Sequence, residues 1–326
     1  MEIRRIGAEG VTRHAVDELA ALLKDDDAVV WVDVPAGDPD AVSVLSEVFG
    51  FHPKAVQDAV SRAPVPRVHI YPDHVFVILH APELGLRGHI HYVELDQFVS
   101  ERYLVTVHGP VNPAVSPAAM RVETDAVGAR LEGGRLICPT GYALSTAVVS
   151  ALTGRMHDHL TARTTEVWSF EQQVTAGELG DVEEFLDGMF RVRHGLLTVR
   201  TMASLSAEVY GRMLRLAAFG EKGQALLDNN VDQFMRLATM ARSQEDYLQG
   251  VIEFYHTRTN TKMTIAAERL AVIAAVTLPV TAVSSVMGMN VIVNAHSDWT
   301  LLGLLFGLMV VMSVTLLIWA KRHGWW

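Results

Sequence analysis

The sequence of 326 residues contains a single cysteine, Cys138, so it cannot form an intrachain disulfide. One cysteine fits a protein whose soluble part lies in a reducing compartment. Lys and Arg total 27 against 37 Asp and Glu, which gives a net charge of −10. Nucleic-acid binding relies on a basic surface, so no nucleic-acid partner is expected. The first ten residues, MEIRRIGAEG, contain no apolar run, and no signal peptide is expected.

Charged residues are also missing from two segments near the C-terminus. Residues 270–287 form an uncharged run of 18 residues, and residues 299–320 form a second run of 22. Each is long enough to cross the roughly 30 Å hydrocarbon core of a bilayer as a helix. The sequence before them carries charges every few residues, as soluble proteins do. We therefore expect a large soluble region followed by a transmembrane hairpin.

Positive charges flank this hairpin at its two outer ends. Lys262 and Arg269 precede the first run, and Lys321 and Arg322 follow the second. The connection over 288–298 contains no Lys or Arg. The positive-inside rule then predicts that both termini lie in the cytoplasm, with the protein in the cell (inner or plasma) membrane.

The region up to residue 140 alternates short β-type runs with short helical ones, which is typical of an α/β domain. Strands are expected over 28–34, 68–71, 74–80, 93–99 and 103–108, and helices over 40–49, 52–60 and 118–131.

From residue 141 the pattern is helical to the end of the chain. Helices are expected over 142–174, over 182–216 and from 226 onward, with breaks at Gly177 to Gly180 and at Gly220 and Gly223. The expected domains are a cytosolic α/β domain over 1–140, a helical bundle and stalk over 141–268, and a transmembrane domain over 269–326. Its spans are expected at about 269–288 and 299–320.

The third helix has no proline before Pro279, and from Leu226 to Met287 it would measure about 93 Å. A rod of this length must extend out of the membrane as a stalk. Apart from Glu245, which interrupts the series, its apolar residues follow steps of four and three: Leu227, Val231, Phe234, Ala238, Ala241, Leu248, Ile252 and Tyr255. Such a stripe fits packing against neighbouring helices of the same chain, and equally packing against copies of itself around an axis.

The tripeptide Gly288-Met289-Asn290 follows the first uncharged run directly, eleven residues after Pro279. With further motifs it makes most of the chain similar to the CorA family of divalent-cation transporters. These motifs are His52-Pro53 with Asp58, Pro66-Arg67-Val68 with Tyr71, Leu104 to His108, and the basic-aromatic tail from Lys321 to Trp326.

This resemblance implies a homopentamer in the lipid bilayer, with a funnel of cytosolic domains. Five first spans would line one pore and five second spans would surround them. It implies a transporter and not an enzyme, with no cofactor, and with Mg²⁺ as the transported and a possible regulatory ion.

The chemistry of the tripeptide suits a filter for a hydrated cation. Mg²⁺ gives up its water reluctantly, so neutral oxygen dipoles facing those waters serve better than charges that would trap the ion. A ring of Asn290 carboxamides would supply such dipoles. Gly288 is expected to allow a sharp exit from the helix, and Met289 to pack against and hold the loop.

Helical spacing back from Asn290 predicts the remaining pore-lining residues. They are Thr264, Ala267, Leu270, Ala274, Leu278, Thr281 and Ser285. Thr281 resembles a polar pore ring of the family, although a membrane threonine commonly bonds to its own helix carbonyls. Leu270 and Leu278 resemble hydrophobic constrictions, and simple interhelix packing would explain them equally well.

Two regions depart from the family pattern. The loop after Asn290 lacks the usual acidic ring, so Asn294, His296 and Asp298 are the candidates for the extracellular mouth. In the stalk, Asn229 stands where some relatives carry an acidic residue at an intersubunit regulatory metal site. Asp228 and Asp232 flank it, so these three residues are the candidates for regulatory metal binding.

Three functions are therefore compared. The first is a passive channel or transporter for Mg²⁺, with Co²⁺ or Ni²⁺ as further cargo. The second is a Zn²⁺ transporter of the related ZntB type, which usually has Ile where this chain has Met289. The third is a membrane-anchored sensor or scaffold, which would need neither Asn290 nor Thr281.

Overall fold

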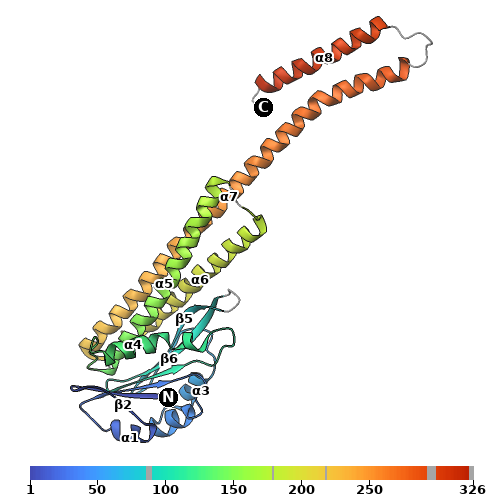
Figure 1. The fold of residues 1–326 in the computed structure, drawn as a ribbon. Coiled ribbons are helices and arrows are strands. Elements are labelled where there is room, and N and C mark those ends of the chain that lie inside the picture. The colour runs from blue at the N-terminus through green and yellow to red at the C-terminus, as the bar shows by residue number, and fades with distance from the viewer. Residues whose placement is uncertain (86–89, 178–179, 217–218, 292–298, 323–326) are drawn as a thin grey trace. The chain divides into compact units, whose positions relative to one another are not determined.

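The computed structural model describes residues 1–85, 90–177, 180–216, 219–291 and 299–322. It divides into two compact units, residues 1–250 and 251–326, and each is described by itself. Helix α7 (Gly220–Val291) supplies residues to both units (Figure 1). The three expected domains divide the chain differently, and their boundaries stay predictions.

A seven-stranded sheet forms the centre of the first unit, in the order β2-β1-β3-β7-β6-β5-β4. The strands are β1 (Glu2–Gly7), β2 (Gly10–His14), β3 (Val29–Val34), β4 (Arg67–Ile70), β5 (Val75–Leu84), β6 (Ile90–Val99) and β7 (Tyr103–His108). Only β3 and β7 run parallel, and the other neighbours are antiparallel. The expected strands are confirmed, and so is the hairpin of β6 and β7.

Strands β1 and β2 were not expected from the sequence, because charged residues interrupt them. The structure shows why the fold accepts these charges. Arg4 is buried with its guanidinium over the ring of Trp31, 4.9 Å from the centroid, and it pairs with Glu132 at 3.1 Å. Tertiary contacts therefore stabilise β1 as a strand, although its sequence does not alternate regularly between apolar and polar residues.

Short helices cover the first face of the sheet. They are η1 (Val16–Glu18), α1 (Leu19–Leu22), α2 (Ala41–Ser43) with the π-helical turn η2 (Val44–Val48), and α3 (Pro53–Val60). Leu45, Ala55 and Val56 from these helices share one apolar core with Val32 and Phe98 of the sheet. The helices expected over 40–49 and 52–60 are thus confirmed.

The second face of the sheet carries one short 3₁₀ helix and longer α-helices. They are η3 (Pro117–Met120), α4 (Val122–Glu132), α5 (Gly141–Ala176) and α6 (Val182–Met213). Helix α5 contacts β3, β5, β6 and β7, while α4 contacts β2. Helix α5 ends at Gly177, which adopts φ 81°, and Asp181 caps α6 by accepting the backbone N–H groups of Glu183 and Glu184.

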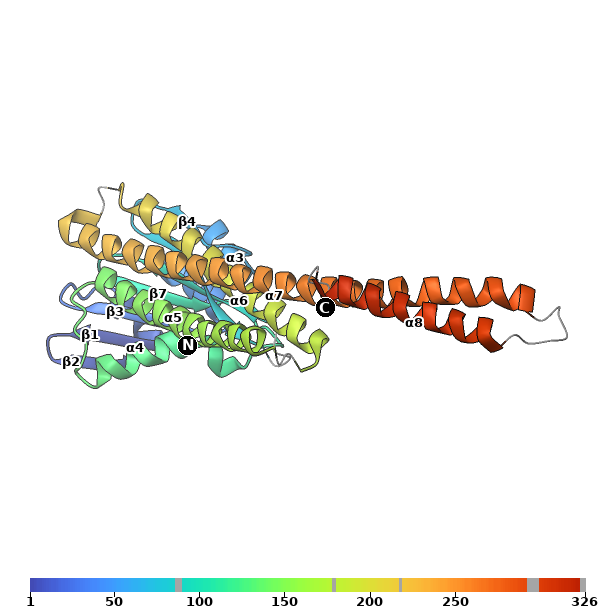
Figure 2. The ribbon, with the colours of Figure 1, turned by 90° about the horizontal axis from the view of Figure 1, so that it is seen from above.

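Helices α5, α6 and the first part of α7 lie side by side (Figures 1 and 2). The ring of Phe234 on α7 stacks on Tyr210 of α6 at 5.8 Å. Thr153 of α5 donates to the side-chain oxygen of Gln233 at 2.7 Å. Of the stripe residues in the first unit, Leu227, Phe234, Ala238, Ala241 and Leu248 are buried, and Val231 is half-buried. Of the two interpretations of this stripe, packing within the chain is the one that the structure shows.

Helix α7 begins earlier than expected. It starts at Gly220, so Gly223 lies inside the helix and does not break it. A Cβ on Gly223 would lie 2.9 Å from the Cβ of Phe219, which shows that the missing side chain permits close packing. The expectation that Gly223 breaks the helix is therefore wrong, because this glycine provides space for close packing.

The second unit is a helical hairpin. Helix α8 (Trp299–Arg322) runs back along the C-terminal part of α7, and the Oγ of Ser284 lies 4.0 Å from the Sδ of Met309 (Figure 1). Both helices are long and apolar enough to cross a membrane. Large side chains of α8 such as Leu304 and Phe306 are 72% and 70% exposed. This exposure suits a unit whose outer surface faces lipid.

Candidate pore helix and its relatives

The predicted pore residues share one side of α7. All seven, from Thr264 to Ser285, are exposed. Val272, Val276, Pro279 and Val283 are buried or half-buried. At 3.6 residues per turn the two sets lie on opposite sides of the helix. In the described part of this unit, α8 is the helix that packs against the C-terminal part of α7. It therefore covers the buried side of α7, which faces away from the predicted pore residues.

The hydroxyl group of Thr281 has a defined direction. Its Oγ1 donates to the carbonyl of Thr277 at 2.8 Å, as expected for a membrane threonine. Since the hydroxyl proton is committed to the helix, the lone pairs of the oxygen remain to accept hydrogen bonds. The hydroxyl of Thr264 likewise donates to the carbonyl of Asn260 at 3.0 Å. Each threonine can therefore present an acceptor to the water shell of a cation.

The tripeptide forms the last turn of α7. The helix continues through Gly288 and ends at Val291, so the expectation of a sharp exit at Gly288 is wrong. No heavy atom lies within 4 Å of a Cβ built on Gly288, and its φ is not positive. The backbone there needs no glycine, because helical hydrogen bonding runs past it. The mouth candidates Asn294, His296 and Asp298 lie outside the described residues.

The stalk candidates for regulatory metal binding lie within two turns of one helix. Asp228, Asn229 and Asp232 are exposed on α7. Asn229 also lines a cavity of about 650 Å³ that contains Tyr142 and Phe219. Within the described ranges, no three His, Cys, Asp or Glu side chains come close enough to hold a metal ion. A site built by several subunits stays a prediction.

The motif from Leu104 to His108 supplies a buried polar network. The Nε2 of His108 lies 3.0 Å from the Oδ1 of Asp33, which also accepts from Thr106 at 2.5 Å. Arg121, just before α4, reaches the other oxygen of Asp33 at 3.4 Å. Burial raises the pKa of Asp33, but the bond from His108, its charge, the bond from Thr106 and the charge of Arg121 outweigh burial and hold the pKa low. These residues tie the start of α4 to the sheet.

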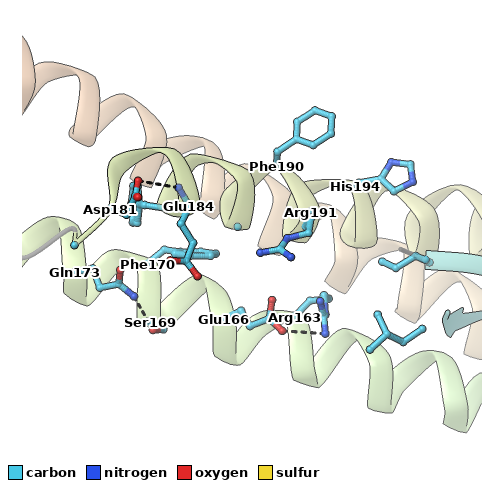
Figure 3. Close-up of a pocket in the computed structure, with 15 residues that line it drawn as sticks. Arg163, Glu166, Ser169, Phe170, Gln173, Asp181, Glu184, Phe190, Arg191 and His194 are labelled. Carbon is cyan, nitrogen blue, oxygen red and sulfur yellow. Dashed lines mark hydrogen bonds and ion pairs between the residues drawn. The ribbon is translucent and has the colours of Figure 1, made fainter. Parts of the chain in front are cut away.

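A pocket of about 650 Å³ opens between α5 and α6 (Figure 3). Arg163 pairs with Glu166 along α5 at 2.9 Å. Phe170 meets Phe185 edge-on at 5.5 Å, and Phe190 points outward. The sequence did not indicate this pocket, because Leu84 and Ile90 from β5 and β6 line it together with residues of α5 and α6.

An extramembrane α/β domain joined to a long helix and an apolar hairpin defines a class of membrane transport protein. The full-length CorA magnesium transporter of Methanocaldococcus jannaschii has this fold, with a TM-score of 0.80, 16% identity, and coverage of 100% of this chain and 99% of that one. The family described as "CorA-like Mg2+ transporter protein" matches residues 26–322. The chain belongs to this family.

Other relatives agree with this assignment. YfjQ of Bacillus subtilis (strain 168), whose name gives it as a candidate metal ion transporter, is 22% identical over 306 residues, covering 92% of this chain and 91% of that protein. The cytoplasmic domain of ZntB from Vibrio parahaemolyticus RIMD 2210633 has a TM-score of 0.58 and 11% identity, covering 80% of this chain and 98% of the domain. Its likeness concerns the fold alone.

Proposed function

We propose that this chain is one subunit of a homo-oligomeric Mg²⁺ channel, a pentamer, in the cell membrane with both termini in the cytoplasm. The observation that carries the proposal is the side of α7 that α8 leaves uncovered. Thr264, Ala267, Leu270, Ala274, Leu278, Thr281 and Ser285 follow this side at helical spacing. In a ring of subunits, this side would line the axis while α8 formed the outer layer.

Gly288, Met289 and Asn290 would form the selectivity filter at the end of the pore helix. The carboxamides of Asn290 would accept hydrogen bonds from the waters of Mg²⁺, so the ion need not be dehydrated. Farther along the pore, the Thr281 oxygen would offer a second ring of acceptors. Co²⁺ and Ni²⁺, which also travel as hydrated divalent ions, would be further cargo.

Leu270 and Leu278 would narrow the pore beyond the Thr281 ring, on the side away from Asn290. Their side chains are 67% and 66% exposed on the uncovered side of α7. An apolar ring that loses its water blocks a hydrated ion without a moving plug. In the open pore, two charges crossing 100 mV are worth about 4.6 kcal/mol, so the membrane potential suffices to drive entry.

Flux through the purified full-length protein in liposomes tests this proposal. Asn290→Ala should abolish selective Mg²⁺ uptake, and Thr281→Ala should reduce uptake several-fold. Thr315→Ala is the matched control, because the Thr315 hydroxyl also bonds a helix carbonyl, that of Val311 at 2.7 Å, but lies on α8. Unchanged flux in Asn290→Ala, or equal losses in the two threonine variants, would contradict the assigned pore side.

The fold likeness to a ZntB domain supports one second candidate, a Zn²⁺ transporter. The same liposomes distinguish the two, because this candidate requires Zn²⁺ uptake faster than Mg²⁺ uptake, with a dependence on pH. If no divalent cation crosses, the membrane-anchored sensor becomes the better explanation.

A further inference from the structure

Three carboxylates approach one another inside the α/β domain, beneath helix α3. Glu94 and Asp96 lie on β6, and their side chains face the same side of the sheet as Phe98, which belongs to the core under α3. Asp58 reaches the same place from α3, with its side chain 14% exposed. Asp96 is 0% exposed and Glu94 is 5% exposed. We call Asp58, Glu94 and Asp96 the carboxylate cluster.

The cluster has too few hydrogen-bond donors for three ionised groups. In the described part of the chain, neither oxygen of Asp96 has a partner, and the Oε1 of Glu94 has none. The Oε2 of Glu94 accepts the backbone N–H of Ala63 at 2.9 Å. A buried carboxylate that loses water without gaining donors is strongly disfavoured in its charged form.

Few positive charges face the cluster. Lys54, on α3, lies 3.2 Å from Asp58, but its own side chain is 63% exposed. On β4, Arg67 and His69 face this side of the sheet; Arg67 is exposed, and the Nε2 of His69 lies 3.7 Å from Asp58. On β5, the Nε2 of His80 donates to the carbonyl of Ala63 at 2.8 Å and lies 3.7 Å from Glu94. Strand β7, beside β6, contributes Tyr103, Val105 and Val107 to this face, and none of them carries a positive charge.

Protons can supply the neutralisation that the protein groups do not. Burial, then the charge of Glu94, then that of Asp58 raise the pKa of Asp96 well above its ordinary value. A metal ion is the other way to neutralise carboxylates. Within the described residues, however, no three ligand side chains are close enough to hold one.

We propose that the carboxylate cluster is a proton-binding site in which Asp96 holds a proton at neutral pH and thereby keeps α3 seated on the sheet. When the proton leaves Asp96, a negative charge appears between Asp58 and Glu94. The repulsion among the carboxylates, and the cost of keeping them from water, both fall when α3, which carries Asp58, moves away and admits water. This inference goes beyond ion transport and does not depend on it.

The direction of the pH effect follows from the raised pKa. The folded state binds the Asp96 proton more tightly than the unfolded chain does. The contribution to stability is therefore fully present below the ordinary carboxyl pKa, and it is lost as the pH rises through the pKa of the folded state. Asp33, on the other face, has a lowered pKa and gives the opposite dependence.

The test compares full-length wild-type protein with Asp96→Asn, which keeps the shape and removes the titration. Glu47→Gln is the matched control, because it removes one carboxylate from an exposed position of η2 on the same face. Hydrogen exchange reports the protection factors of the α3 amides. In wild type and Glu47→Gln, these factors should fall with rising pH, by up to about tenfold per pH unit above the Asp96 pKa. In Asp96→Asn they should stay level.

Infrared spectroscopy of the wild type supplies a second measurement, which tests the proposal even if Asp96→Asn does not fold. A protonated carboxyl band should be present at neutral pH and disappear as the pH rises together with the α3 protection. Absence of that band at neutral pH would overturn the proposal. So would equal pH profiles in wild type and Asp96→Asn, or protection that follows added Mg²⁺ at constant pH.

Discussion

Truncation of Phe234 tests whether the apolar stripe of α7 stabilises the single chain. Phe234 is 0% exposed, and its ring stacks on Tyr210. Deleting a fully buried phenylalanine side chain typically costs about 3–5 kcal/mol, because transfer and cavity terms add. The ring contact with Tyr210 accounts for about 0.5–1.5 kcal/mol of this cost. Phe234→Ala should therefore be among the most harmful single changes in the first unit.

The neighbouring residue offers a matched control. Met235 is 53% exposed on the next position of the same helix, so Met235→Ala should change stability by less than about 0.5 kcal/mol. Each kcal/mol shifts the Tm of a domain of this size by about 2–4 °C. Thermal unfolding followed by circular dichroism should thus show a loss of about 6–20 °C for Phe234→Ala.

The comparison also separates packing within a chain from packing between copies. If Phe234 packs within its own chain, the loss of Tm should not depend on protein concentration. Equal Tm values for Phe234→Ala and Met235→Ala, or a loss of Tm that disappears on dilution, would refute the conclusion that the stripe packs within its own chain.

Two further predictions concern single positions in the first unit. Gly141→Ala should destabilise the protein, because the added Cβ would lie 2.3 Å from the backbone oxygen of Ser100. Gly154→Ala should instead stabilise α5 by about 0.5–1 kcal/mol, because no atom lies within 4 Å of the added Cβ. Thermal unfolding should show Tm shifts of opposite sign for the two variants. Asp33→Asn should cost about 1–3 kcal/mol at neutral pH, since the lowered pKa of Asp33 stabilises the fold above the ordinary carboxyl pKa. That cost should shrink as the pH falls below about 4, and a constant difference in Tm across this range would contradict it.

Much of the secondary structure could be predicted because it depends on local patterns. The uncharged runs at 270–287 and 299–320 lie within α7 and α8, since an apolar run of that length favours a membrane helix whatever surrounds it. Helices α5 and α6 begin within one residue of their predicted starts, where Thr140 and Asp181 cap them. The family resemblance on Gly288-Met289-Asn290 is confirmed by the match over 26–322.

Other features could not be predicted because their causes lie far along the chain. Arg4 fits a strand because Trp31 and Glu132, both distant in the sequence, receive its charge together with the nearby Glu2. Gly223 permits close packing that is invisible in a local pattern. The unpartnered oxygens of Asp96 become evident only when α3 covers β6.

The sequence by itself determined that the chain ends in two membrane helices and that the tripeptide closes the first of them. Length, missing charge and order along the chain suffice for this, because a span satisfies its backbone hydrogen bonds internally. The tertiary structure decided which side of each helix is covered. It buried Phe234 against Tyr210, and it turned the side of α7 that bears Thr281 away from α8. Such choices depend on contacts between distant segments, and one segment's periodicity does not contain them.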